Sequence, residues 1–92
     1  MSKEANTVFI GKKPPMSYVL AVITSFNSGE TKEVTLKARG RAITTAVDVV
    51  EIIRRRFLKN INISKITTGT EEIAVEEGGK RSVSTIEIVL NI

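Results

Sequence analysis

The segment from Glu33 to Arg39 alternates strictly between apolar and polar residues, and it lies between two segments with the periodicity of amphipathic helices. Val34, Leu36 and Ala38 are its apolar members, which is the pattern of a strand with one buried face. When a strand follows an earlier strand and a helix, the connection is a right-handed crossover, and the two strands lie parallel in one sheet. This arrangement constrains the fold more than any other feature of the chain.

The earlier strand and helix of this crossover are recognised by their composition and by the residues that end them. Residues 7–10, Thr-Val-Phe-Ile, read as a short buried strand that ends at Gly11. Pro14 and Pro15 favour a helix start, because proline is tolerated in the first turn. The helix should end at residues 27–29, Asn-Ser-Gly. Its apolar residues at helical spacing are Met16, Val19, Leu20, Ile23 and Phe26.

A second helix follows the alternating strand. It is predicted from Thr44 or Thr45 to Phe57, and Thr45 with Asp48 three residues later fits a capping pattern. Its apolar surface is broader than one core requires, so the extra width marks either a subunit interface or a helix buried deeply in a small protein. The main stripe comprises Ile43, Ala46, Val47, Val50, Ile53 and Phe57, and Val49 and Ile52 widen it on one side.

The last third of the chain predicts a long hairpin. Residues 61–77 and 80–92 read as two strands joined at Gly78 and Gly79, a strong turn signal. The apolar residues of the second strand change parity near Ser84, which predicts a bulge or a twist there. The element order is therefore β-α-β-α-β-β. The fold class is α/β, an α+β two-layer sandwich with both helices packed on one sheet.

Length and composition limit the functions that this chain can have. Its 92 residues suffice for one domain, predicted over residues 1–92 with a flexible N-terminus at 1–6. No apolar run approaches the length needed to span a membrane. The lack of cysteine and histidine excludes thiolate chemistry, a zinc site and a Ser-His-Asp triad. We therefore expect neither an enzyme nor a bound metal or cofactor.

Positive charge is concentrated in the first two thirds of the chain. Residues 1–65 contain 12 Lys/Arg and 5 Asp/Glu, whereas residues 66–92 contain 2 and 5. Parallel strands end at the same edge of a sheet, and helix N-termini at that edge favour anions. The edge is therefore either a phosphate-binding cradle or a solvated basic surface. The residues expected there are Lys12 and Lys13 after the first strand, with Lys37, Arg39 and Arg41 at the end of the second.

Charged side chains on the second predicted helix favour ion pairs over catalysis. Arg54 to Arg56 point in three directions around a helix, and Glu51 lies at ion-pair spacing from two of them. Asp48 and Glu51 are three residues apart, but their arginine neighbours make a catalytic pair of carboxylates the weaker interpretation.

The tip of the predicted hairpin also has two interpretations. Lys80 and Arg81 follow the turn, where a β-ribbon arm could enter a DNA groove. Glu76 and Glu77 lie opposite and repel phosphates, which favours a solvated turn.

Three segments carry motifs that occur together in a known family. They are Ile10-Gly-Lys-Lys-Pro-Pro-Met-Ser-Tyr-Val19, Lys37-Ala-Arg-Gly-Arg-Ala-Ile43 and Val83-Ser-Thr-Ile-Glu-Ile88. In order and spacing they resemble the Alba family of small archaeal chromatin proteins, over about residues 7–90. The resemblance implies the fold of the C-terminal domain of a bacterial translation initiation factor. It also implies a cytoplasmic, nucleoid-associated homodimer that binds double-stranded DNA, and often RNA, and condenses the chromosome.

The resemblance further implies roles for particular residues. The family's lysine pair, here Lys12 and Lys13, contacts nucleic acid, and acetylation of the first lysine by an acetyltransferase, reversed by a deacetylase, weakens binding. Phe57 corresponds to a phenylalanine of the dimer–dimer contact, and we add Val49 and Ile52 from the helix flank to the candidate interface. The other candidate nucleic-acid-binding residues are Lys37, Arg39, Arg41, Lys80 and Arg81, with Tyr18 expected to line the binding edge.

The leading prediction is thus a sequence-nonspecific, DNA-binding chromatin protein. The alternative is an RNA-binding protein, either an RNA chaperone or a ribonucleoprotein subunit. Aromatic residues make up 4% of the chain, and the phenylalanines are interpreted as structural. Stacking platforms for single-stranded bases are therefore scarce, which favours duplex binding.

Overall fold

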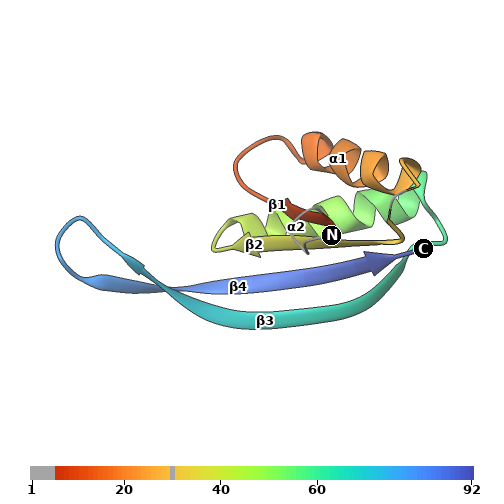
Figure 1. Ribbon diagram of the computed structural model, residues 1–92. Helices are drawn as coiled ribbons and strands as arrows, with labels where there is room; N and C mark the ends of the chain where they lie inside the picture. Colours follow the sequence, from red (N-terminus) through yellow and green to blue (C-terminus); the bar gives the residue numbers. More distant parts are fainter. Residues whose placement is uncertain (1–5, 30) are drawn as a thin grey trace.

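The computed structural model describes residues 6–29 and 31–92, and its element order is the predicted one (Figure 1). Apart from Asn6, the N-terminus predicted to be flexible lies outside the described residues. No helix in the described part of the chain is long and apolar enough to cross a membrane. The elements are β1 (Thr7–Phe9), α1 (Pro15–Asn27), β2 (Glu33–Arg39), α2 (Ala42–Ile52), the π-helical turn η2 (Ile53–Phe57), β3 (Asn62–Ala74) and β4 (Lys80–Asn91).

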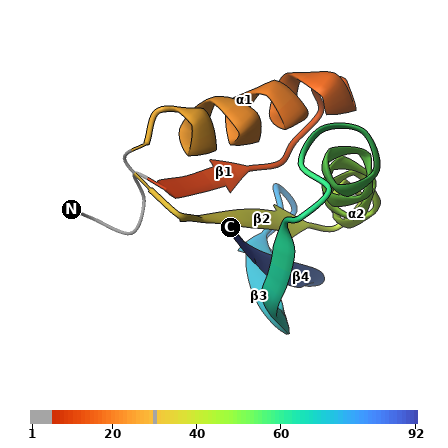
Figure 2. The ribbon, with the colours of Figure 1, turned by 90° about the vertical axis from the view of Figure 1, so that its right-hand side faces the viewer.

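The four strands form one sheet in the order β1-β2-β4-β3. β1 and β2 are parallel, as the crossover predicts, and β4 is antiparallel to both of its neighbours. Both helices lie on one face of the sheet and pack mainly on β1 and β2, and β3 extends beyond them (Figure 1 and Figure 2). The predicted two-layer sandwich is confirmed. We call the face without helices the open face.

The core lies between the helices and the sheet. Val34, Leu36 and Ala38 of β2 are buried, as the alternation predicts. α1 differs from the prediction in the face that it buries, because Tyr18 and Val22 enter the core with Val19 and Phe26. Met16 and Leu20 of the predicted stripe are instead exposed, by 42% and 57%. The buried face is displaced around the helix because the Tyr18 ring packs against the sheet layer.

β1 is an edge strand, and the prediction that it is buried is wrong for Phe9. Val8 pairs in register with the buried Leu36 and packs against the core. Side chains alternate between the faces of a strand, so Phe9 points to the open face. Its side chain is 62% exposed there.

α2 begins two residues earlier than predicted, and its expected capping pattern is not used. Its N-cap residue is Arg41, which makes no side-chain capping hydrogen bond. Gly40 has a φ of 57°, a left-handed conformation that turns the chain from β2 into α2, and its carbonyl accepts a hydrogen bond from the N–H of Ile43 (3.1 Å). The helix widens into η2, where Leu58 N–H bonds to the carbonyl of Ile53 (2.8 Å).

The hairpin strands are shorter than predicted, and the turn spans residues 75–79 with Gly78 at a φ of 84°. Of the bulge or twist predicted near Ser84, the bulge is wrong, because pairing is regular there and the irregularity lies between Ile63 and Lys65. Ser84 is instead fixed to the body, since its carbonyl accepts a hydrogen bond from the N–H of Gly40 (2.9 Å). From this point outward the strand pairing is only between residues 70–74 and 80–84, and the segment 70–84 projects from the body, as Figure 1 shows. We call this segment the arm.

Candidate nucleic-acid interface

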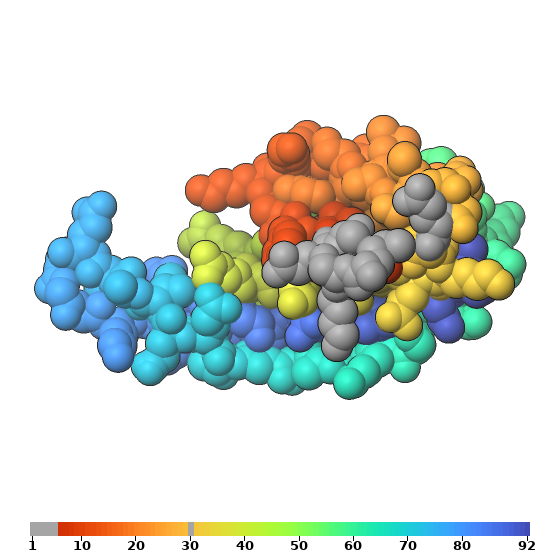
Figure 3. Space-filling view, in the orientation of Figure 1, coloured from red at the N-terminus to blue at the C-terminus, as the bar shows by residue number. Residues whose placement is uncertain are grey.

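Topology brings most of the predicted basic residues to one end of the molecule. β1 and β2 end there and α1 and α2 begin there, so we call it the loop end. The arm projects from the same end, because β3 runs parallel to β2 and continues past it. Figure 3 shows a hollow at the loop end, between the protruding loop after β1 and the upturned tip of the arm. The basic residues at this end are Lys12, Lys13, Arg39, Arg41, Lys80 and Arg81.

Lys12 and Lys13 lie on an exposed loop whose backbone is held by hydrogen bonds to the Tyr18 side chain. Tyr18 is only 8% exposed, and its hydroxyl oxygen accepts hydrogen bonds from the N–H groups of Gly11 (2.9 Å) and Lys13 (3.0 Å). Among the described residues, no carboxylate forms an ion pair with either lysine. The two positive charges are therefore available to an external anion. The sequence predicts Tyr18 at the binding edge, but its side chain is buried beneath the loop that carries the two lysines.

The positive potential of the two helix N-termini at the loop end is not compensated by a capping side chain or by an acidic residue in the first turn. α1 follows Pro14 and has neither a side-chain cap nor an acidic residue in its first turn. α2 follows Arg41 and lacks both as well. A helix N-terminus carries about half a positive charge and favours anions, and here lysine or arginine lies beside each of them. The loop end is electrostatically suited to phosphate.

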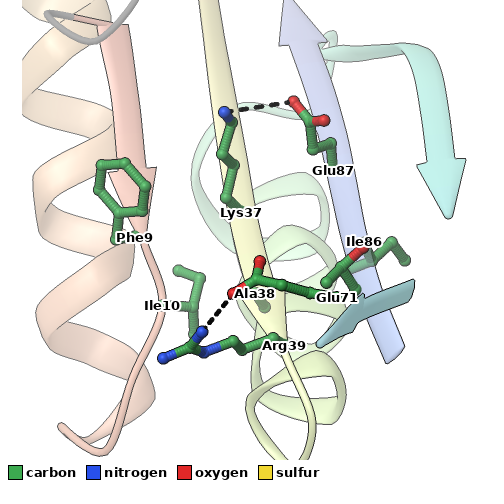
Figure 4. Close-up of a pocket in the computed structure, with 9 residues that line it drawn as sticks. Phe9, Ile10, Lys37, Ala38, Arg39, Glu71, Ile86 and Glu87 are labelled. Carbon is green, nitrogen blue, oxygen red and sulfur yellow. Dashed lines mark hydrogen bonds and ion pairs between the residues drawn. The ribbon is translucent and has the colours of Figure 1, made fainter. Parts of the chain in front are cut away.

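Lys37 and Arg39 point to the open face, where each has a carboxylate partner (Figure 4). Lys37 Nζ lies 3.7 Å from a carboxylate oxygen of Glu87 on β4, and the Arg39 guanidinium donates a 2.5 Å hydrogen bond to Glu71 on β3. Both pairs are about half exposed. Among the described residues, the five predicted cations thus divide into Lys12, Lys13 and Arg41, which have no ion-pair partner, and Lys37 and Arg39, which are paired.

The arm presents more negative than positive charge. Lys80 and Arg81 are exposed and pair in register with Ala74 and Ile73. Since they are successive residues of β4, their side chains lie on opposite faces of the arm. The arm also carries four glutamates: Glu71, Glu72, Glu76 and Glu77. This charge balance disfavours a polyanion along the arm.

Phe9 is a candidate residue that the sequence interpretation missed. It lines an open-face pocket together with Lys37, Arg39, Glu71 and Glu87, as Figure 4 shows. An exposed aromatic ring beside cationic side chains is typical of sites that stack unpaired bases. The alternation of Val8 and Phe9 contained the signal, because only one of two successive strand residues faces the core.

The predicted interface residues occupy different environments. Val49 is fully buried within the core and offers no surface to a second copy. Ile52 is half-buried beside a shallow pocket that α2 forms with Pro15, and Phe57 is 45% exposed. The predicted ion pair of Glu51 is confirmed with Arg54, at 3.1 Å. In the described ranges no group of three acidic residues could hold a metal ion.

A separate apolar surface lies where the sheet extends beyond the helices. Ile66 of β3 pairs in register with Ile88, which is buried under the helices, so Ile66 points to the helix side of the sheet. Its side chain is nevertheless 55% exposed, and Val47 of α2 is 43% exposed. Figure 2 shows β3 extending past α2 on this side. We refer to these two exposed residues as the uncovered apolar face.

Comparisons with known proteins agree with the fold and identify the family of the chain. A sequence model of the Alba family matches residues 6–70. The chain is 56% identical over 87 residues to the DNA/RNA-binding protein Alba of Methanocella arvoryzae, covering 95% of this chain and 90% of the relative. It is 58% identical over 85 residues to the DNA/RNA-binding protein Alba 1 of Archaeoglobus fulgidus, covering 92% and 93%. The solved structure of Alba from Thermoplasma volcanium is similar with a TM-score of 0.88 at 45% identity, over 95% of this chain and 100% of that one.

Proposed function

This chain belongs to the Alba family, and from that premise we propose that it is a nucleoid-associated chromatin protein. It binds double-stranded DNA without sequence preference, and it coats and compacts the DNA as a homodimer. The observation that carries the proposal is the loop end, where Lys12, Lys13 and Arg41 lie beside two uncapped helix N-termini. Such an arrangement recognises phosphates, which every DNA sequence presents alike.

Phosphate binding at the loop end depends on side chains more than on the loop backbone. The N–H groups of Gly11 and Lys13 already donate to Tyr18. The lysine ammonium groups therefore supply the main contacts, assisted by Arg41 and the helix N-termini. Lys80 and Arg81 extend this surface along the arm, and the neighbouring glutamates make their contribution smaller. Residues 1–92 act as one nucleic-acid-binding domain.

The homodimer contact is supported by the uncovered apolar face. Val47 and Ile66 are exposed on the helix side of the sheet, and burial of such residues drives association. Phe57, at the end of η2, is available for a further contact between dimers on DNA. We expect Ile66→Lys to lower the molar mass in solution from that of a dimer to that of a monomer, as measured by light scattering. A mass that stays dimeric places the contact elsewhere.

Fluorescence anisotropy with a duplex of one sequence, made as DNA and as RNA, tests the proposed function. A plot of the logarithm of the association constant against the logarithm of the salt concentration has a negative slope, and each phosphate contact makes it steeper by about 0.9. One contact therefore contributes about eightfold to the affinity at 0.1 M salt. For each protomer that contacts the duplex, the double variant Lys12→Ala with Lys13→Ala should weaken DNA binding about 10- to 60-fold and make the slope shallower by about 1.8. Unchanged affinity and slope exclude the loop end as the binding site.

A matched control removes the same charge from the other end of the molecule. Lys32 precedes β2 and Lys59 follows η2, and both side chains are exposed. The variant Lys32→Ala with Lys59→Ala has the same net charge as the loop variant. We expect it to retain most of the affinity, because screening limits charge effects to about 10 Å at 0.1 M salt. An equal loss in both variants indicates a general charge effect and contradicts a localised site.

RNA binding is a second candidate function, favoured by the exposure of Phe9. The ring lies on the open face beside Lys37, where it can stack an unpaired base, and stacking is worth about 1–3 kcal/mol per base. Phe9→Leu keeps an apolar side chain but removes the aromatic ring. We expect it to weaken binding of single-stranded RNA and to leave duplex DNA binding unchanged. Equal effects on both ligands contradict a stacking role.

A further inference from the structure

The hydroxyl of Tyr18 joins the core to the loop that carries Lys12 and Lys13. The phenol ring is buried on α1, and its oxygen accepts two backbone hydrogen bonds, from Gly11 (2.9 Å) and Lys13 (3.0 Å). The two donors flank Lys12. The loop therefore curves around the Tyr18 oxygen, and exposed Lys12 lies between the two anchored positions.

This contact fixes a segment that has little other support. Residues 11–14 belong to neither β1 nor α1, and all four residues are exposed. A short loop of exposed residues ordinarily retains conformational freedom, and fixing each residue of a chain costs about 1–2 kcal/mol. A tyrosine ring has only two side-chain torsions and is held here by core packing. Its oxygen is thus a rigid acceptor placed against a loop that would otherwise be mobile.

We propose that Tyr18 is a positioning residue for nucleic-acid binding, which acts by holding the Lys12–Lys13 loop in its binding conformation and does not contact the nucleic acid. The inference rests on the proposed function of that loop. Its energetic basis is preorganisation: the ordering cost of the loop is met during folding and does not reduce the affinity.

Tyr18→Phe separates the hydroxyl from the ring. The phenyl group keeps the core filled, whereas both N–H groups lose their acceptor. Because the lysines remain, the number of phosphate contacts is unchanged. We therefore expect DNA affinity to fall about 3- to 10-fold, as the loop must be ordered on binding, with the same salt slope as the wild type. The loop variant lacking both lysines, in contrast, has a shallower slope.

Two further measurements distinguish positioning from loss of stability. Amide hydrogen exchange followed by NMR should show faster exchange of the Gly11 and Lys13 N–H groups in Tyr18→Phe. Val22→Ala, a core change on the same helix at a fully buried residue, provides the stability control. It should lower the denaturation midpoint without accelerating these two amides or weakening DNA binding, at a temperature where all variants are folded.

A double-variant cycle gives the decisive result. When Lys12 and Lys13 are both alanine, Tyr18→Phe should cause no further loss of affinity, because the loop then has no charge to position. The same loss in both backgrounds, or unchanged affinity in Tyr18→Phe alone, overturns the inference. If removal of the lysines itself leaves DNA binding intact, the proposed function fails. That result is distinct, because the exchange rates of Gly11 and Lys13 report on the Tyr18 contact without DNA.

Discussion

Two pairs of basic residues in this protein look alike in the sequence, but their side chains have different environments in the structure. Lys12 and Lys13 lie on a loop between β1 and α1, and among the described residues they have no ion-pair partner. Lys37 and Arg39 lie on β2, and each has a carboxylate partner: Glu87 of the neighbouring strand β4 pairs with Lys37, and Glu71 of β3, one strand further away, pairs with Arg39. Both groups carry two positive charges. Only the loop group offers them to a ligand without first breaking an interaction within the protein.

The difference follows from the type of backbone that carries each group. A strand places its side chains directly opposite those of its neighbours, so a cation on β2 meets the side chains of β4. A long side chain such as that of Arg39 also reaches Glu71 on β3, which lies beyond β4. The loop after β1 leaves the sheet and has no such neighbour. Exposed ion pairs contribute only about 0–1 kcal/mol, so the glutamates lower the availability of Lys37 and Arg39 without excluding them from binding. We expect the loop to dominate affinity and the strand to modulate it.

The largest effect should come from one charge on the loop. Lys12→Gln removes the charge while keeping a long polar side chain, as acetylation does. We expect DNA affinity to fall by up to about eightfold at 0.1 M salt, because one phosphate contact is lost. Anisotropy titrations measure this change, with Lys32→Gln as a control of equal net charge. An equal loss in Lys32→Gln means that the loop has no special role.

Releasing a strand cation should have a smaller and opposite effect. Glu71→Gln removes the ion-pair partner of Arg39, and we expect DNA affinity to rise about two- to threefold, within the range of an exposed ion pair. Glu72→Gln changes the net charge equally but lies on the opposite face of the arm, because it is the next residue of β3. If both variants bind alike in the same titration, the gain is due to net charge and not to Arg39.

Charge changes at the tip of the arm should affect DNA affinity less than Glu71→Gln does. Neutralising its tip with Glu76→Gln and Glu77→Gln removes repulsion near Lys80 and Arg81. We expect a gain in DNA affinity of about twofold or less, because exposed charges at a turn are strongly screened. The gain should disappear at high salt. A gain above that of Glu71→Gln contradicts the ranking and assigns the arm a larger role.

The smallest expected effect concerns the stability of the fold, when both members of the ion pair between Arg39 and Glu71 are removed. The variant Arg39→Gln with Glu71→Gln keeps the net charge, and we expect the free energy of unfolding to change by about 1 kcal/mol or less. Leu36→Ala, in the core beneath the same strand, should cost about 2–5 kcal/mol. Urea denaturation compares the two variants. A similar loss of unfolding free energy in both variants indicates that the ion pair stabilises the fold in addition to restraining Arg39.

The phenylalanines illustrate how sequence interpretation succeeds and fails. Phe26 is buried, as predicted from helical spacing, whereas Phe9 and Phe57 are 62% and 45% exposed. An aromatic residue in a short strand has the same composition signal whether it faces inward or outward. Only the position of β1 at the sheet edge and the register of Val8 with Leu36 show that Phe9 points away from the core.

The element order, the parallel pairing of the first two strands and the buried face of β2 could all be predicted from local sequence patterns. These follow from local periodicity and from the handedness of chain connections, which do not depend on distant residues. The sequence also predicts that Lys12 and Lys13 meet two helix N-termini. Which basic residues are paired depends on tertiary contacts, because Glu71 and Glu87, the partners of Arg39 and Lys37, come from strands about 32 and 50 residues away. The structure likewise decided that Tyr18 supports the loop from the core, since a hydrogen bond to a backbone N–H leaves no pattern in the sequence.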